Sequence, residues 1–467
     1  MKKCGESRIF YKRMCDMETK ENKMGTMAEG KLLAAMAIPM MISMLLQALY
    51  NVVDSYFVSR VSQDAFNALS LAFPLQSLMI GLGAGTGLGV NALISRSLGE
   101  KRQDMADRVA NTGVVLFALC AALFAVIGFT CSAPFFRAQT DVTAIVEAGT
   151  VYCTICVGCS FGIFFQFCFE RFLQATGRTM LSMITQVTGA IINIIMDPIL
   201  IFGYLGFPAM GVKGAAIATV LGQIVAAALG LFINLKKNPD IHLKPAEMRF
   251  RQDIATEIYK IGFPSILMQC VGSFLVFGMN QILLTFSTVA TAVYGAYFKL
   301  QSFIFMPVFG LNNGMVPIIS YNYGARRPER VKKTIRLSMY AAVGIMLFGM
   351  LLFELFPAPL LRIFDADTAM LRDGVPAFRI IATSYLFAGF CIIAGSVFQA
   401  IGNPMHSLAV SICRQLVVLL PAAYLLSLTR RLELVWFSYP IAEIFSLLFS
   451  VYFLRKTMDA MNKRFAE

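Results

Sequence analysis

The chain has 467 residues, of which 57% are hydrophobic and only 14% are charged. Soluble domains average about 25% charged residues, so this composition excludes a large soluble enzyme and indicates a protein that crosses a membrane many times. The net charge is +13, but no soluble basic domain carries it, so the charge does not indicate a nucleic-acid-binding protein.

Apolar runs separated by short polar links predict the helices in chain order. Runs of about 20 residues are long enough to span a bilayer. The fold class predicted is an all-α membrane protein with about twelve spans in two lobes. The predicted spans lie near 38–59, 67–95, 109–131, 145–170, 180–203, 213–234, 260–285, 291–320, 336–356, 376–398, 406–428 and 434–454.

A long polar link near the middle of the chain divides the spans into two sets of six. We therefore expect two lobes that fold around separate sets of helices. The predicted segments are a cytoplasmic N-terminal segment at 1–36, an N-lobe at 37–234, a cytoplasmic linker at 235–259, a C-lobe at 260–454 and a cytoplasmic tail at 455–467.

The basic residues predict the direction of the spans. If the N-terminus is cytoplasmic, thirty of the 40 Lys and Arg residues fall in cytoplasmic segments, seven fall in outer links and three fall within spans. Cytoplasmic loops of membrane proteins carry an excess of Lys and Arg, so we expect both termini to face the cytoplasm. The positive charge then reflects sidedness and attraction to anionic lipid.

The two halves of the sequence resemble each other at a constant offset of 225 residues. Pro39 corresponds to Pro264, and QATGRTMLS (174–182) corresponds to QAIGNPMHS (399–407). Each unit holds an even number of spans, so the two repeats enter from the same side and are parallel. Two parallel bundles around a central cleft are typical of transporters. A membrane enzyme would need a catalytic cluster, and the sequence offers none, so we predict that the chain is not an enzyme.

Two motifs within spans have a packing interpretation and a binding interpretation. The run GLGAGTGLG (81–89) lacks the preceding strand and the Lys-Ser/Thr of a phosphate-binding loop. Its glycines at four-residue spacing instead favour close helix packing. Cys153, Cys156 and Cys159 form a CxxCxxC run without a histidine or second cysteine pair, which favours helix packing over a zinc site.

Asp54 lies in the middle of the apolar run LLQALYNVVDSYFV (45–58). An ionised Asp near the middle of a span costs about 2.5–3.5 kcal/mol on insertion scales, so acids in spans usually mark functional sites. Residues three, four and seven positions apart share one helix face. The first span therefore carries a polar stripe that we expect to face inward, made of Gln47, Tyr50, Asn51 and Asp54.

The fifth span carries a matching acid. Asn193 and Asp197 stack at i, i+4, and Pro198 frees a backbone carbonyl oxygen and is expected to kink the helix. Asp54 and Asp197 lie at similar distances from the outer ends of their spans. Thr219 lies at the same depth on the sixth span, and Gln223 lies one turn deeper. We expect these side chains to converge inside the N-lobe.

Two carboxylates in one apolar compartment cannot both stay ionised without a partner. Either a cation bridges them or at least one of them holds a proton. No basic residue in the N-terminal spans is placed to pair with Asp54 or Asp197. The alternative, that each acid is neutralised structurally or lies at a wet helix end, stays open, but the pattern favours a site for a coupling proton or sodium ion.

Two further charged positions have open interpretations. Glu170 lies near the cytoplasmic end of the fourth span, where a gate or substrate contact and a solvated helix end are both compatible with its position. Arg414 and Glu443 lie in spans of the C-lobe, where a structural pair and a substrate contact are equally compatible with the sequence.

The sequence resembles the multidrug and toxic compound extrusion (MATE) transporters over nearly all of the chain after residue 30. The resemblance rests on IPMMISMLLQALYNVVDSYFV, on the SRSLGEKR link, on FLQATGR and on the duplicated twelve-span plan. It implies two six-helix lobes and cation-coupled export of bulky, mostly cationic and aromatic compounds.

The resemblance also implies roles for individual residues. In one branch of the family a cation site lies in the N-lobe, and a proline in the first span bends upon protonation; Pro39 matches that proline. Another branch uses acids of the seventh and tenth spans, where this chain offers only Gln269 and no acid. The residues that match the N-lobe cation site are Tyr50, Asp54, Asn193, Asp197 and Thr219.

We therefore predict a proton- or sodium-coupled antiporter of the plasma membrane that acts as a monomer on drug-like compounds and needs no cofactor. The only metal expected is a transient sodium ion at Asp54 and Asp197. Substrate-cleft candidates are Gln47, Asn51, Glu170, Gln223, Gln269 and Arg414. The alternative is a flippase of lipid-linked oligosaccharide or another amphipathic lipid. Lys299 and Arg414 support this alternative, because basic residues in the cleft could bind the phosphate of such a lipid.

Overall fold

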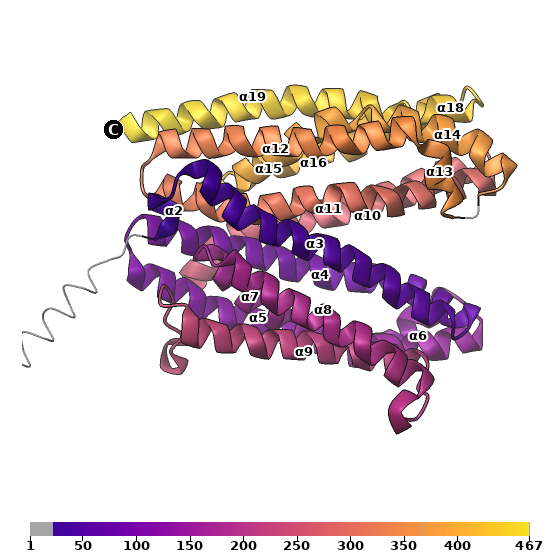
Figure 1. Ribbon diagram of the computed structural model, residues 1–467, viewed down its shortest axis with the longest axis horizontal. Helices are drawn as coiled ribbons and strands as arrows, with labels where there is room; N and C mark the ends of the chain where they lie inside the picture. The colour runs from indigo at the N-terminus through magenta and orange to yellow at the C-terminus, as the bar shows by residue number, and fades with distance from the viewer. Residues whose placement is uncertain (1–21, 365, 467) are drawn as a thin grey trace, which may run out of the picture.

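The computed structural model describes residues 22–364 and 366–466, and in these residues all regular structure is helical (Figure 1). Ten helices are long and apolar enough to cross a membrane, and two bent helix pairs raise the total to 12. The predicted all-α membrane fold is thus confirmed. Most helices run past the predicted spans, because their polar ends continue the helix beyond the apolar run.

The N-lobe is built from helices that follow one another across the bundle. A short helix precedes it, and one 3-10 turn connects its last two long helices. The elements are α2 (Lys23–Thr26), α3 (Glu29–Ser59), α4 (Gln63–Gly99), α5 (Gln103–Arg137), α6 (Thr143–Cys156), α7 (Phe161–Ala175), α8 (Thr179–Phe202), η1 (Tyr204–Gly206) and α9 (Val212–Lys237).

The C-lobe repeats this plan after a linker that contains the 3-10 turn η2 (Pro245–Glu247). Its penultimate span is interrupted by a π-helical segment, η3. The elements are α10 (Gln252–Leu284), α11 (Thr288–Gly324), α12 (Pro328–Leu355), α13 (Pro357–Arg362), α14 (Thr368–Ala382), α15 (Tyr385–Ile401), α16 (Pro404–Ile412), η3 (Cys413–Leu419), α17 (Leu420–Ser427), α18 (Leu432–Val435) and α19 (Ser438–Ala466).

The two lobes lie side by side, with α3 next to α11 where they meet (Figure 1). Helix α2 and the end of α19 lie at the same end of the bundle, which we call the terminal face (Figure 1). The linker docks on the N-lobe there: the backbone N–H of His242 donates to Asp107 at 2.9 Å, and Arg178 pairs with Asp240 at 3.0 Å.

Two predicted spans are bent rather than straight. Helices α6 and α7 meet at 42°, and α14 and α15 meet at 49°, so the spans predicted near 145–170 and 376–398 are each two helices. At the first bend the backbone of Gly158 approaches Gly128 of α5 so closely that a methyl group on Gly128 would lie 2.3 Å from the Gly158 nitrogen. Hydropathy does not encode such a bend, because both halves are apolar.

Each lobe takes part of its hydrophobic core from the other. The beginning of α3, with Leu33 and Met36, packs in the cluster formed mainly by the C-lobe. The beginning of α10, with Ile258 and Ile261, packs in the N-lobe cluster. Leu33 and Ile258, and Met36 and Ile261, are related by the 225-residue offset, so the exchange follows the repeat. The lobes are therefore interlocked near the terminal face.

Small residues let the lobes approach each other along a surface that we call the seam, formed by α3 against α11 and α4 against α10. A methyl group on Gly89 would lie 2.2 Å from the carbonyl oxygen of Ile258. On the other side, a methyl group on Gly314 would lie 2.7 Å from the Cα of Ala37. The predicted packing role of the glycine-rich run is confirmed, because Gly85 and Gly89 both contact α10.

The segment around α2 contacts both lobes at the terminal face. The side-chain amide of Asn22 donates to the carbonyl of Thr176 in the N-lobe at 3.1 Å. From the C-lobe, Asn322 donates to the carbonyl of Met24 at 3.0 Å, and Arg330 donates to the carbonyl of Met27 at 2.6 Å. The segment around α2 therefore connects the two lobes. It was predicted only as part of the polar N-terminal segment 1–36, of which residues 1–21 lie outside the described part of the chain.

Candidate functional site

The two acids of the N-lobe spans lie next to each other. Asp54 of α3 and Asp197 of α8 lie close enough for their carboxyl groups to interact. Asp197 is completely buried. Within the described chain, no Lys or Arg lies within ion-pair distance of either acid. The arrangement places two acidic groups in a compartment from which water is largely excluded.

A cavity of about 80 Å³ lies one helical turn from the acids. Tyr50 and Asn193 line it, and Asp54 and Asp197 follow four residues later on the same two helices. The amide of Asn193 donates to the hydroxyl of Thr219 on α9 at 3.2 Å. A single water needs about 10–15 Å³ of space measured in this way, so the cavity has room for several waters or an ion.

The buried polar atoms around this cavity that lack a partner are all oxygens. They include both carboxylate oxygens of Asp197 and one of Asp54. Four others belong to Ser43, Gln186, Asn193 and Gln223. A buried acceptor without a donor costs about 1–3 kcal/mol, so this concentration favours water or a ligand that can donate hydrogen bonds or positive charge. Protons, sodium ions and the N–H groups of organic cations all satisfy oxygen acceptors.

Glu170 of α7 is buried, with 2% of its surface exposed. The interpretation as a solvated helix end is therefore wrong. Its carboxylate accepts hydrogen bonds from Gln166 at 2.9 Å and from Gln186 at 3.5 Å, and both glutamines line the cavity. Arg171 points elsewhere, as expected from its position on the helix, and donates to Asn313 of the C-lobe at 3.1 Å. Glu170 thus contacts the cavity through two amides.

The other cleft candidates divide into those that line the cavity and those that do not. Gln47 and Gln223 line it. Asn51 is exposed and does not line it, although it shares a helix face with Asp54 in the sequence pattern. Gln269 is exposed and lies at the seam, where its Cβ would be 3.3 Å from a methyl group on Gly81.

The prolines of the two site helices lie within continuous helices. Pro39 is buried in α3, and Pro198 lies in α8, one residue after Asp197. Proline removes the hydrogen bond to the carbonyl four residues earlier. At α3 that carbonyl belongs to Ala35, and it accepts a hydrogen bond from the hydroxyl of Thr179 on α8 at 3.4 Å. Helix α8 therefore donates a hydrogen bond to α3 at the point where Pro39 interrupts the backbone hydrogen bonds of α3.

Among the polar residues of α3 and α8 that line the cavity, the sequence pattern missed Ser43 and Gln186. Both extend the stripes that were recognised, because Ser43 precedes Gln47 by one turn and Gln186 precedes Asn193 by two turns. Following each polar stripe one or two turns further would have found them. The burial of Glu170 had no such signal, because Gln186, one of its two hydrogen-bond partners, comes from α8 and not from its own helix.

Arg414 and Glu443 form an ion pair inside the C-lobe. Their nearest nitrogen and oxygen are 2.8 Å apart, and the Glu443 side chain is only 9% exposed. Arg414 lies in the π-helical segment η3, which is a type of irregularity often found at functional sites. The predicted pairing of the two residues is confirmed, and a substrate contact of Arg414 stays a prediction. Lys299, the other basic residue of the C-lobe that suggested a phosphate site, lies over the ring of Phe364.

Replacing Arg414 by Leu should destabilise the protein by about 3–5 kcal/mol, because Glu443 would be left as an uncompensated buried charge. The double replacement Arg414→Leu/Glu443→Leu should recover most of this loss. Denaturant unfolding of the single and double variants measures the interaction. Arg372→Leu is the control, since its pair with Asp373 is at the surface and should be worth less than about 1 kcal/mol. Additive effects of the two single replacements would contradict this prediction.

The two parallel six-helix repeats, the seam between them and the acid pair inside one lobe define a membrane transporter. The MatE family pattern matches residues 39–199 and 264–425, which is more than half of the chain. The chain therefore belongs to the MatE family.

Relatives and solved structures agree with this assignment. The multidrug export protein MepA of Staphylococcus saprophyticus is 28% identical over 396 residues, covering 84% of this chain and 86% of that protein. An FAD transporter of Shewanella oneidensis is 26% identical over 402 residues, covering 85% of this chain and 88% of that protein. The outward-facing structure of a multidrug resistance MATE family transporter of the MOP superfamily superposes with a TM-score of 0.90 at 25% identity, covering 95% and 99% of the two chains.

Proposed function

We propose that this protein is a proton- or sodium-coupled antiporter that exports bulky cationic or aromatic compounds by alternating access of its two lobes. The observation that carries the proposal is the pair formed by Asp54 and Asp197, which lacks a basic partner among the described residues. Such a pair is stable in an apolar compartment only with a proton or a metal cation. The multidrug export proteins among its relatives support the same class of substrate.

In this mechanism the coupling ion and the conformation of the lobes depend on each other. A cation that neutralises the acid pair removes their repulsion and lets α3 and α8 pack closely. Loss of the cation leaves Asp54 and Asp197 both ionised. Because the two carboxylates then repel each other, an arrangement of α3 and α8 that separates or hydrates them has the lower free energy. Tyr50 and Asn193 connect the acid pair to the cavity, so a change at the acids alters the surface that a substrate meets.

The orientation that we propose places the terminal face in the cytoplasm of a cell whose plasma membrane the protein crosses, because the Lys- and Arg-rich segments gather there. With the seam packed and the segment 22–29 bound to both lobes, this face is closed. Export then requires the seam to separate so that substrate enters from the cytoplasm. The cavity of about 80 Å³ must also widen to admit a bulky compound.

The flippase alternative has no specific support in the C-lobe. Its basis was a pair of basic residues available to a phosphate, Lys299 and Arg414. The charge of Arg414 is neutralised by Glu443, and Lys299 lies against an aromatic ring. Around the N-lobe cavity, the unpartnered atoms of the described residues are acceptor oxygens except for the Ser43 hydroxyl, which suits a cation better than a phosphate.

Efflux measured under separate ion gradients tests the proposal. Protein reconstituted in liposomes should export a fluorescent cationic dye when either a proton gradient or a sodium gradient is imposed, and the gradient that works identifies the coupling ion. Liposomes without protein and liposomes with equal ion concentrations on both sides serve as controls. Dye export that ignores both gradients would refute antiport.

A further inference from the structure

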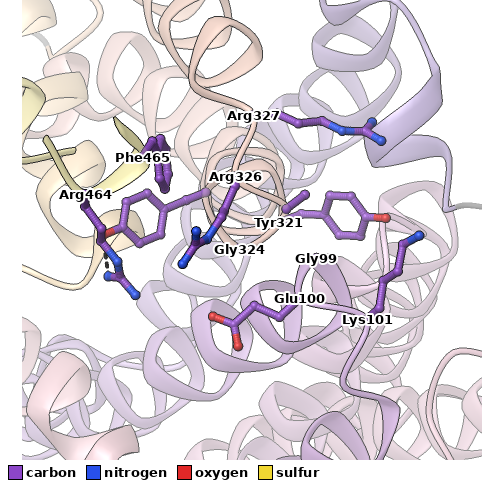
Figure 2. A pocket seen from close by; sticks show the side chains of 11 residues that line it. Gly99, Glu100, Lys101, Tyr321, Gly324, Arg326, Arg327, Arg464 and Phe465 are labelled. Carbon is purple, nitrogen blue, oxygen red and sulfur yellow. Dashed lines mark hydrogen bonds between the residues drawn. The ribbon is translucent and has the colours of Figure 1, made fainter. Parts of the chain in front are cut away.

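A basic hollow of about 540 Å³ lies on the terminal face between the two lobes, and none of the proposed transport steps uses it (Figure 2). Residues from the end of α4, from the end of α11 and from the last turn of α19 surround it (Figure 2). The lining residues are Gly99, Glu100, Lys101, Tyr321, Tyr323, Gly324, Ala325, Arg326, Arg327, Arg464 and Phe465.

The charges around this hollow are unbalanced. Apart from Arg327, which donates to the carbonyl of Gly25, the cations Lys101, Arg326 and Arg464 face the single carboxylate of Glu100. That carboxylate already pairs with Arg96 at 3.0 Å and Arg102 at 3.5 Å, neither of which is a lining residue. Within residues 22–364 and 366–466, no carboxylate lies within ion-pair distance of Lys101, Arg326 or Arg464. Excess positive charge is therefore directed into the hollow.

Lys101 and Arg326 hold the same unusual backbone conformation. Their φ angles are 59° and 53°, in the left-handed region, and the two positions are related by the 225-residue repeat. Each residue follows the C-terminal turn of a helix, a position usually taken by glycine because side chains are strained there. If these positions only ended a helix, glycine would adopt the left-handed conformation with less steric strain. Strain of this kind at a non-glycine residue points to a role for the side chain.

A tyrosine fixes one of the cations. The Arg464 guanidinium donates to the hydroxyl of Tyr323 at 2.8 Å and lies 5.3 Å from its ring centre. Arg96 of the N-lobe lies 5.4 Å from the same ring centre. Tyr323 therefore holds guanidinium groups from both lobes. A fixed guanidinium loses less conformational freedom when it binds a phosphate, so the hollow is partly organised before a ligand arrives.

Two ordinary explanations account for part of this charge but not for its arrangement. Helix C-termini attract cations, yet each carries only about half a negative charge, whereas Lys101, Arg326 and Arg464 carry three full positive charges. The general excess of basic residues on one face of a membrane protein does not require them to converge on one hollow from three separate helices.

We propose that this hollow binds a phosphate group, either of an anionic phospholipid headgroup or of a soluble phosphate compound. Arginine forks match phosphate oxygens, and basic pockets between membrane helices are known to hold lipid headgroups. Lys101 belongs to the N-lobe, and Arg326 and Arg464 belong to the C-lobe. The complete site exists only while the lobes meet at the terminal face, so the ligand stabilises that conformation.

The thermal stability of purified full-length protein, titrated with defined probes, tests the proposal. Short-chain phosphatidylglycerol and inorganic pyrophosphate are the two phosphate probes, and phosphatidylcholine and chloride at matched ionic strength are their controls. Stabilisation by phosphatidylglycerol alone assigns the lipid headgroup, and stabilisation by pyrophosphate alone assigns a soluble compound. Stabilisation by both assigns the phosphate group itself. No stabilisation beyond that of the control probes would overturn the proposal.

The variant Lys101→Gly/Arg326→Gly separates binding from a structural role. Glycine relieves the left-handed strain, so the unliganded protein should be at least as stable as the original, while phosphate binding should weaken at least about tenfold. Arg464→Gln is a second variant, expected to weaken binding without touching either strained turn. Lys236→Gln/Lys237→Gln removes two charges from the exposed end of α9 and should leave affinity within about twofold. Equal weakening in this control would show non-specific attraction and overturn the site.

Discussion

Replacing Asp54 or Asp197 by Asn should lower the rate of cation-driven efflux at least about 100-fold, which exceeds the effect expected from any other single polar replacement in the N-lobe. Asn keeps the size of the side chain but cannot carry the charge that a proton or sodium ion neutralises. The two acids interact and have no basic partner among the described residues, so either one alone cannot hold the coupling ion in the same way. The measurement is the initial rate of dye export from liposomes under an imposed gradient.

The double variant Asp54→Asn/Asp197→Asn should lose little more activity than either single variant, because groups that act as a unit are not additive. Asp64→Asn is the matched control, since Asp64 is an exposed acid in the first turn of α4. Dye exchange in the absence of a gradient should persist in the acid variants if they fold and bind substrate. Gradient-driven export that stays within about twofold of the original in both single variants would contradict the coupling role.

Much of this site follows from counting along the sequence. The offset of 225 residues and the distance of Asp54 and Asp197 from their span ends were enough to place the two acids on helices of one lobe at one depth. That reasoning succeeds because a helix rises by a fixed amount per residue, so position along the chain converts directly into depth. Tyr50 and Asn193, one turn earlier on the same helices, then line a common cavity.

Other features depend on partners that are distant in sequence. Glu170 is buried and accepts a hydrogen bond from Gln186 of the next helix, and nothing in its own span predicts that contact. Asn51 is exposed because of the rotation of α3 about its own axis within the bundle. The spacing of polar residues along the sequence does not determine this rotation. Leu33 and Met36 belong to the core of the opposite lobe, although their position before the first apolar run suggested a polar segment.

Adding a methyl group at Gly89 or at Gly314 should shift the protein away from the conformation with a packed seam. The new carbon at Gly89 would lie 2.2 Å from the Ile258 carbonyl oxygen, and at Gly314 it would lie 2.7 Å from the Cα of Ala37. Both neighbours are backbone atoms that cannot rotate aside, so the lobes must separate locally. Overpacking of this kind costs about 1–3 kcal/mol, which corresponds to a shift in the conformational equilibrium of roughly 5- to 150-fold.

The distance between spin labels at Arg108 of the N-lobe and Arg336 of the C-lobe, both exposed, reports this equilibrium. Gly89→Ala and Gly314→Ala should each populate a longer distance, and the effects should resemble each other because the repeat relates the two positions. Gly295→Ala is the control on the same helix as Gly314: its added carbon meets no atom within 4 Å, so the distance should not change. The seam is the surface that must part for access from the terminal face. An unchanged distance in both seam variants would mean that the lobes part elsewhere.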